Sequence, residues 1–372
     1  MLFADIIGQE EVKEKLIRNI NAGQVAHAQL FCGNSGSGKL GLAIAYARYL
    51  FCRNRREGDA CGECPSCKKI DLLTHPDLHF TFPIVKNKKR EICDDFLPEW
   101  REMVTKSPYF SYDQWLTHIE AGNSQGVIYT REGSEIFQKL TLKSLEADYK
   151  CMIIWLPEKM HEACANKLLK LIEEPYDKTL FLLVSDTPEQ ILATIRSRTQ
   201  LIQIKPLPAD IIERELLTQF NIDAENARTI SRIANGDFIK ACEMVSVSDQ
   251  NEQFHTLFVA AMRNSWKRDV AVMKQWSEQI AAMGREQQKS LLQYFQHYLR
   301  ENYIYNFKQP ELNYMTREEE KFSTSFAQFV NERNIELFIS EFEKAEKEVS
   351  QNVNAKMVFF DLSLKIAVLL KK

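Results

Sequence analysis

The first 205 residues alternate short apolar runs with longer stretches in which apolar residues recur every three or four positions. The apolar runs are AQLFC (28–32), KCMIIW (150–155), LFLLVS (180–185) and LIQI (201–204). Continuous apolar runs of this length are typical of strands that are buried on both faces. Strands that alternate with amphipathic helices predict an α/β fold, with a mainly parallel sheet and helices on both of its faces.

The pattern changes at KPLP (205–208), after which the strand signals stop. Residues 206–248 have the pattern of a small helical lid domain. From 249 to 372 the chain carries only helical periodicity, and its aromatic stripes are typical of a helix-bundle core. Several of these helices are apolar on more than one face, which also suits an interface between subunits of an oligomer. We therefore predict three domains, with residues 1–205 forming the α/β domain.

Composition restricts the class of protein. The 372 residues carry a net charge of −3, which gives no whole-chain argument for binding nucleic acid or membranes. The opening MLFADIIGQEEVKEKL is acidic and helix-like rather than a signal peptide, and no apolar run approaches the ~20 residues of a membrane span. We expect a soluble, cytoplasmic protein. The basic run KNKKRE (86–91) suits either a DNA contact or, more often, a solvated loop.

Four of the nine cysteines fall within CRNRREGDACGECPSC, and they are Cys52, Cys61, Cys64 and Cys67. In a reducing cytoplasm, clustering of this kind favours a metal over disulfides. Gaps of two residues let consecutive thiolates converge on one ion, and a structural zinc site takes four such ligands. An iron–sulfur cluster and free thiols are the alternatives. The nearby upstream cysteine, and the absence of a Cys-Pro ending, favour zinc.

The segment LFCGNSGSGKL (30–40) nearly matches a nucleotide-binding P-loop. Gly33, Gly38 and Lys39 stand at the glycine, glycine and lysine positions, and such a loop cradles phosphates at a helix N-terminus. Leu40 stands where a Ser or Thr hydroxyl would bind magnesium. The match therefore predicts the shape of a cofactor site without its metal ligand.

A second part of the nucleotide site is also altered. The strand in KCMIIWLPEKM ends in Trp155 and Leu156, where a P-loop ATPase would present Asp-Glu. Neither side chain can hold hydrated magnesium or polarise a water molecule. Glu158 lies two positions further on and would need a shift in register. We therefore expect ATP and Mg²⁺ not to be bound productively.

Several segments together resemble a known family. They are FADIIGQEEVKEKLIRNINAGQVAHAQLFCG, NKLLKLIEEP, FLLVSDTPEQILATIRSRTQ and VNAKMVFFDLSLKIAVLL, with the four-cysteine insertion and HPDLHF after it. The chain is similar to bacterial clamp-loader proteins of the AAA+ class, and most of all to the delta-prime subunits of DNA polymerase III clamp loaders. The resemblance covers nearly the whole chain except about 84–130, an insertion without an assigned role.

The resemblance implies a subunit that does not hydrolyse ATP. ATP-binding members of the family carry Ser or Thr after the lysine, Asp-Glu on the strand and an arginine in the lid, where this chain has Leu40, Trp155, Leu156 and Ile239. The resemblance further implies a hetero-oligomer with gamma/tau and delta subunits, within the DNA polymerase holoenzyme. In that assembly the chain would act as a stator while the sliding clamp is loaded onto primed DNA.

One catalytic element is retained. The segment SRT (197–199) is similar to the family's Ser-Arg-Cys segment. The resemblance makes Arg198 an arginine finger that reaches the γ-phosphate of ATP on a neighbouring subunit, a task that suits a planar guanidinium. Arg196 is the second candidate, and an ordinary surface salt bridge is the alternative for Arg198.

Two other functions stay open. The first is a gamma/tau-like clamp-loader ATPase with a divergent active site, which ATP hydrolysis by the isolated chain would reveal. The second is a zinc-containing DNA-binding protein outside the replisome. The near-neutral charge argues against it, because tight phosphate binding normally needs clustered Lys and Arg.

Overall fold

The structure is a computed structural model that describes residues 1–56, 58–122, 124–220, 222–308 and 315–371. The chain divides into two compact units, Met1–Val245 and Ser246–Lys372, and each is considered by itself. Within the described ranges, no helix is both long enough and apolar enough to cross a membrane. The finer division into three domains stays a prediction.

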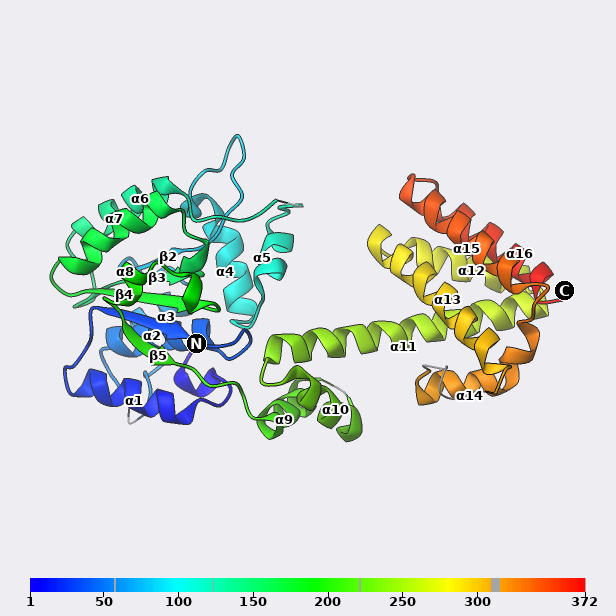
Figure 1. Ribbon diagram of the computed structural model, residues 1–372, viewed down its shortest axis with the longest axis horizontal. Helices are drawn as coiled ribbons and strands as arrows, with labels where there is room; N and C mark the ends of the chain where they lie inside the picture. The colour runs from blue at the N-terminus through cyan, green and yellow to red at the C-terminus, as the bar shows by residue number, and fades with distance from the viewer. Residues whose placement is uncertain (57, 123, 221, 309–314, 372) are drawn as a thin grey trace. The chain divides into compact units, whose positions relative to one another are not determined.

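The first unit is built around a five-stranded parallel sheet with the strand order β2-β3-β4-β1-β5 (Figure 1). The strands are β1 (Ala28–Cys32), β2 (Leu78–Thr81), β3 (Lys150–Trp155), β4 (Thr179–Ser185) and β5 (Gln200–Gln203). The predicted parallel α/β fold is confirmed. β2 is missing from the predicted strands because its four residues, LHFT, are too few and too mixed to give a signal. β5 is an edge strand and is largely exposed, contrary to the burial on both faces expected from its sequence.

Alternating side chains give the sheet two apolar faces. On β3, Cys151 and Ile153 belong to one buried cluster, whereas Met152 and Ile154 belong to the other. Neighbouring residues of a strand point to opposite faces, so a run without polar residues must be covered on both sides. One face is covered by α1 (Glu10–Asn21), α2 (Lys39–Phe51), α3 (Pro65–Asp71), α4 (Leu97–Lys106) and α5 (Tyr112–His118), and the other by α6 (Thr130–Thr141), α7 (Glu162–Glu173) and α8 (Ala193–Arg196).

Three helical segments follow the sheet within the first unit. They are α9 (Ala209–Gln219), α10 (Ala224–Ala234) and the beginning of α11 (Phe238–Lys267), which continues into the second unit. They share a buried cluster with Ile7 and Leu207. Asn235 ends α10 in the left-handed region at φ 50°, and Gly236 follows at φ 87°. This turn brings the start of α11 against the P-loop, as described below.

The second unit is entirely helical in its described residues. After α11 it contains α12 (Val270–Ala281), α13 (Arg285–Tyr305), α14 (Arg317–Phe326), α15 (Ile335–Ser350) and α16 (Ala355–Leu369). Phe258, Phe295 and Phe342 are fully buried in one cluster. The aromatic stripes of the sequence are therefore the core of a helix bundle, as predicted.

The insertion at about 84–130 packs into the core of the first unit. It contributes α4 and α5, whose Trp100 and Trp115 are fully buried against the sheet. The Trp100 ring stacks on Phe82 with the ring centroids 4.2 Å apart, and Trp115 meets it edge-on at 5.3 Å. The insertion is therefore part of the folded domain and not a surface appendage.

Replacing Trp100 by alanine is expected to lower the free energy of unfolding by about 3–5 kcal/mol, because it leaves a large cavity among aromatic rings. Urea unfolding followed by circular dichroism measures this change. Trp100→Phe is the matched control: it keeps a ring and removes an indole N–H that has no hydrogen-bond partner among the described residues, so it should cost much less. A loss below about 1 kcal/mol for the alanine variant would contradict the tight packing of the insertion.

Candidate nucleotide and metal sites

The P-loop forms the turn between β1 and α2. Gly38 is the N-cap of α2 and has φ 88°, a conformation that favours glycine, and Lys39 is the first residue of the helix. Gly33 lies directly after β1. The three predicted loop residues therefore sit where the backbone N–H groups of a P-loop would surround phosphates.

The lysine of the loop is engaged by its own chain. Lys39 is only 4% exposed, and its Nζ donates to the carbonyl oxygen of Gly33 at 2.8 Å and to that of Asn34. It also forms an ion pair of 2.8 Å with Asp186 Oδ1. Oxygen atoms of the chain itself therefore surround the Lys39 ammonium group.

Three of the four altered positions line one small cavity beside this lysine. Leu40, Trp155 and Ile239 come from α2, the end of β3 and the start of α11, and together with Lys39 they border a cavity of about 30 Å³. These three apolar side chains offer no ligand to hydrated magnesium. The Asp186 carboxylate also borders the cavity, where it pairs with Lys39.

The remaining positions at the end of β3 have structural roles. Leu156 takes the left-handed conformation at φ 55° and its N–H donates to the Val184 carbonyl at 2.8 Å. Glu158 Oε1 accepts hydrogen bonds from the N–H groups of Asp186 at 2.9 Å and Thr187 at 3.1 Å. Glu158 therefore caps the end of β4, and no shift in register brings it to the P-loop.

Asp186 is a site residue that the sequence patterns did not single out. It follows β4 directly, as polar residues at the carboxyl ends of parallel strands often do when they face a ligand site. That position was the available signal, and the lysine that it pairs with lies on a different strand–helix turn. Only the sheet order, in which β4 neighbours β1, places the two side chains together.

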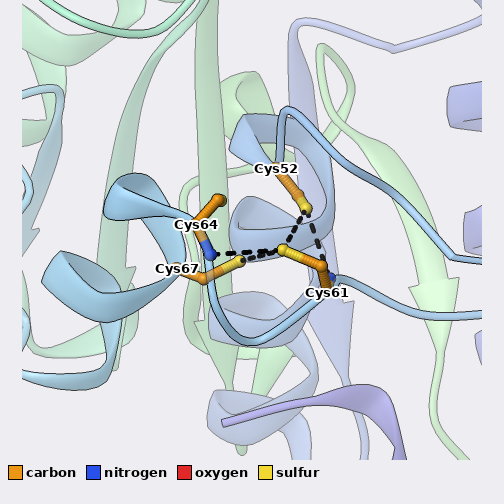
Figure 2. A group of neighbouring side chains, drawn as sticks. All are labelled: Cys52, Cys61, Cys64 and Cys67. Atoms are coloured by element: carbon orange, nitrogen blue, oxygen red, sulfur yellow. Dashed lines mark hydrogen bonds between the residues drawn. The ribbon is translucent and has the colours of Figure 1, made fainter.

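The four clustered cysteines converge at one point (Figure 2). All four are buried, and their sulfur atoms lie within 4.8 Å of one another. The Sγ atoms of Cys52 and Cys61 are 3.5 Å apart, and those of Cys61 and Cys67 are 3.9 Å apart. Tetrahedral zinc with Zn–S bonds of ~2.3 Å separates its sulfur ligands by about 3.8 Å, so the residues present fit this metal.

Local backbone structure holds these ligands in place. Cys52 is the C-cap of α2, Cys64 is the N-cap of α3, and Cys67 lies within α3. Gly62 has φ 76° in the turn between the second and third cysteines. Backbone N–H groups of Glu63 and Cys64 lower the pKa of Cys61 to about 6, which favours the thiolate form that binds metal.

Charged side chains surround the cysteine cluster. Burial raises the pKa of Cys67 to about 12, and the neighbouring Arg48 guanidinium opposes that shift. Arg48 Nη2 is also 2.8 Å from Asp71 Oδ2, and the N-terminal amine is 2.7 Å from Asp71 Oδ1. Asp59 accepts hydrogen bonds from the backbone N–H groups of Phe3 and Ala4. The segment from Cys52 to Asp71, called the cysteine module below, therefore fixes the first residues of the chain against α2.

The candidate arginine finger lies at the surface. Arg198 follows α8, is 40% exposed, and pairs through Nη2 with Oε1 of Glu173 at 2.7 Å. Its Nη1 also donates to the Thr194 carbonyl at 3.1 Å. Arg196 donates to the Pro188 carbonyl at 3.4 Å. In the described structure the Arg198 guanidinium is thus in the surface pair with Glu173, and its exposure leaves it accessible to another molecule.

The sheet order, the P-loop turn and the helical segment that packs on it define a protein of the P-loop AAA+ type. The model of the family described as "DNA polymerase III, delta subunit" matches residues 8–208. The chain belongs to this family, as its sequence resemblance predicted.

Individual relatives agree with the family. The chain is 29% identical over 248 residues to the DNA polymerase III subunit delta' of Bacillus subtilis (strain 168), covering 66% of this chain and 60% of that protein. It is 30% identical over 197 residues to the subunit delta' of Escherichia coli (strain K12), covering 52% and 47%. The chain thus spans less than two thirds of the length of both relatives. A solved structure of a DNA polymerase III gamma subunit-related protein from Thermotoga maritima aligns with 95% of this chain and 99% of its own length. The identity is 13% and the TM-score is 0.35, too low to support an argument.

Proposed function

We propose that the chain is a delta-prime-like subunit of a bacterial DNA polymerase III clamp loader that does not hydrolyse ATP itself. The observation that carries this proposal is the small P-loop cavity of about 30 Å³, in which Leu40, Trp155 and Ile239 stand where metal-binding and phosphate-binding groups would be needed. Membership of the delta subunit family supports a role in the DNA polymerase III clamp loader.

In this proposal the chain is the stator of a cytoplasmic hetero-oligomer. Its partners are the gamma/tau ATPase subunits and the delta subunit, and through the complex it acts on the sliding clamp and on primed DNA. The helix bundle of the second unit serves as the collar that joins it to its neighbours. The chain thereby contributes to DNA-directed DNA polymerase activity without performing the chemistry.

Two site assignments belong to the same proposal. Cys52, Cys61, Cys64 and Cys67 hold a structural zinc ion, for which the convergence of their sulfur atoms is the support. Arg198 acts in trans on ATP bound by a neighbouring subunit. Its surface position and its simple ion pair support that role, because an exposed pair of this kind contributes only roughly 0–1 kcal/mol and is readily exchanged for a phosphate contact.

Reconstitution tests the proposal. The chain is expected to co-purify with gamma/tau and delta subunits and to raise their clamp- and DNA-stimulated ATPase rate and clamp loading, while the isolated chain hydrolyses no ATP. Substantial hydrolysis by the isolated chain would favour the gamma/tau-like ATPase instead. Failure to join the complex, combined with salt-sensitive binding of duplex DNA alone, would favour a DNA-binding protein.

A further inference from the structure

The insertion at about 84–130 delivers a short segment into the P-loop cavity. Between α4 and α5 the chain passes through Pro108, Tyr109 and Phe110, and all three line the same cavity as Lys39. The other lining residues come from the P-loop, the ends of β3 and β4, and the start of α11. A segment about 70 positions from the P-loop in the sequence is therefore one wall of the phosphate site.

Tyr109 is held against the N-terminus of α2. Its Oη accepts a hydrogen bond from the Ile7 N–H at 2.9 Å, and its ring meets the Phe238 ring edge-on with the centroids 5.3 Å apart. A methyl group placed on Gly38 would lie only 3.0 Å from Tyr109 Oη. Phosphates bind to the free N–H groups at this end of a P-loop helix, so the tyrosine hydroxyl stands in their approach.

Phe110 packs against one of the altered residues of the nucleotide site. Its ring centroid is 5.1 Å from that of Trp155 and 5.7 Å from that of Trp100. On the other side of the segment, a methyl group placed on Gly41 would lie 3.4 Å from Pro108 Cβ. The insertion and the tryptophan at the end of β3 are therefore two halves of one packing arrangement.

The start of α11 packs against the P-loop at Gly36. The Phe238 N–H donates to the Gly36 carbonyl at 3.4 Å, and a methyl group placed on Gly36 would overlap Asp237 Oδ1 at 1.9 Å. The remaining cavity of about 30 Å³ has room for one or two water molecules. Sites for small-molecule ligands span roughly 300–1,000 Å³, so the triphosphate part of a nucleotide has no space here.

We infer that residues 108–110 are an intramolecular plug, which takes the place of a nucleotide and holds the P-loop, the start of α11 and the insertion together. The inference deepens the proposed function and rests on it for the view that this chain hydrolyses nothing itself. A bound nucleotide stabilises a fold only while it is present, by an amount that rises with the logarithm of its concentration. A plug within the chain is always present, so the first unit keeps one conformation while neighbouring subunits bind and release ATP.

Binding of inorganic tripolyphosphate to the isolated chain, measured by calorimetry without magnesium, tests the plug. The unchanged chain is expected to show no binding at millimolar concentrations. The double variant Tyr109→Ala/Phe110→Ala should bind measurably, at least tenfold more tightly than the detection limit set by the unchanged chain. Adding Lys39→Ala to that variant should abolish the gain. Tyr109→Phe removes only the hydroxyl and keeps the ring, so it should bind tripolyphosphate far more weakly than the double variant. A folded double variant that binds no better than the unchanged chain would overturn the inference.

A second measurement needs no variant and therefore no assumption about folding. Pyridoxal phosphate reacts with accessible lysines near anion sites, and borohydride fixes the adduct for peptide mapping. Lys39 of the unchanged chain is expected to stay unlabelled while exposed lysines such as Lys88 react. Labelling of Lys39 would overturn the plug. Both assays omit partner subunits, so their failure is distinguishable from a failure to assemble into a clamp loader.

Discussion

Replacing Arg198 by alanine is expected to slow ATP hydrolysis at the neighbouring subunit's site by a factor on the order of 10³, the lower end of the effect of arginine fingers. The physical reason is that a guanidinium spreads positive charge over the phosphate oxygens where negative charge develops. In the proposed assembly, Arg198 would act at the ATPase site of one neighbouring subunit, and hydrolysis at other sites would mask its effect. The measurement therefore needs a reconstituted complex in which those other sites are disabled, with clamp and primed DNA present.

Arg196→Ala is the matched control because Arg196 lies two positions away and contacts only a backbone carbonyl among the described residues. It should leave hydrolysis near the level of the unchanged complex. Arg198→Lys keeps the charge and loses the planar fork, so it should recover only part of the rate. Unchanged ATPase and clamp loading with Arg198→Ala would reject the finger, and a loss confined to Arg196→Ala would move the role to that residue.

The ion pair with Glu173 adds a sharper expectation. Glu173→Gln removes the negative charge that Arg198 contacts in the described structure. Because both side chains lie at the surface, 40% and 46% exposed, the pair contributes little stability, and the variant should unfold at nearly the same urea concentration. Hydrolysis at the neighbouring site should stay within a few-fold. A loss as large as that of Arg198→Ala would instead make Glu173 a required positioning residue.

Replacing Cys67 by serine is expected to reduce the zinc content from one equivalent to none and to destabilise the first unit. Structural zinc sites have apparent binding free energies of ~10–16 kcal/mol, so losing one ligand should cost on the order of 5 kcal/mol of unfolding free energy. The effect should reach beyond the cysteine module, because Asp59 and Asp71 of that region hold the first residues of the chain. Elemental analysis and urea unfolding measure the two parts.

Cys242→Ser provides the comparison, since Cys242 is half-buried and lies outside the cluster. It should retain one equivalent of zinc and unfold close to the unchanged chain. Retention of a full equivalent of zinc by Cys67→Ser would contradict the four-ligand site. A brown protein that absorbs in the visible region would show that the four cysteines hold an iron–sulfur cluster and not zinc.

Much of the fold was predictable because its signals are local. The runs at 28–32, 150–155 and 180–185 contain almost no polar residue, which a strand tolerates only when both faces are covered. β5 shows the limit of the same reasoning. The run LIQI (201–204) predicted a buried strand, yet the strand that forms is QLIQ (200–203), and its place at the edge of the sheet leaves Leu201 54% exposed. Strand order is a property of the whole chain and not of four residues.

The candidate sites were likewise predictable in part: their residues from the sequence, their contacts only from the tertiary structure. The cysteine spacing and the glycine–lysine loop are short motifs, so the sequence by itself determined which residues form each cluster and which metal-binding hydroxyl and carboxylates are missing. The partners of those residues were decided by tertiary structure alone. Asp186 reaches Lys39 because β4 lies beside β1, and Tyr109 reaches Gly38 because the insertion folds back over the sheet. Contacts between distant segments depend on packing and loop closure, which no local pattern of residues encodes.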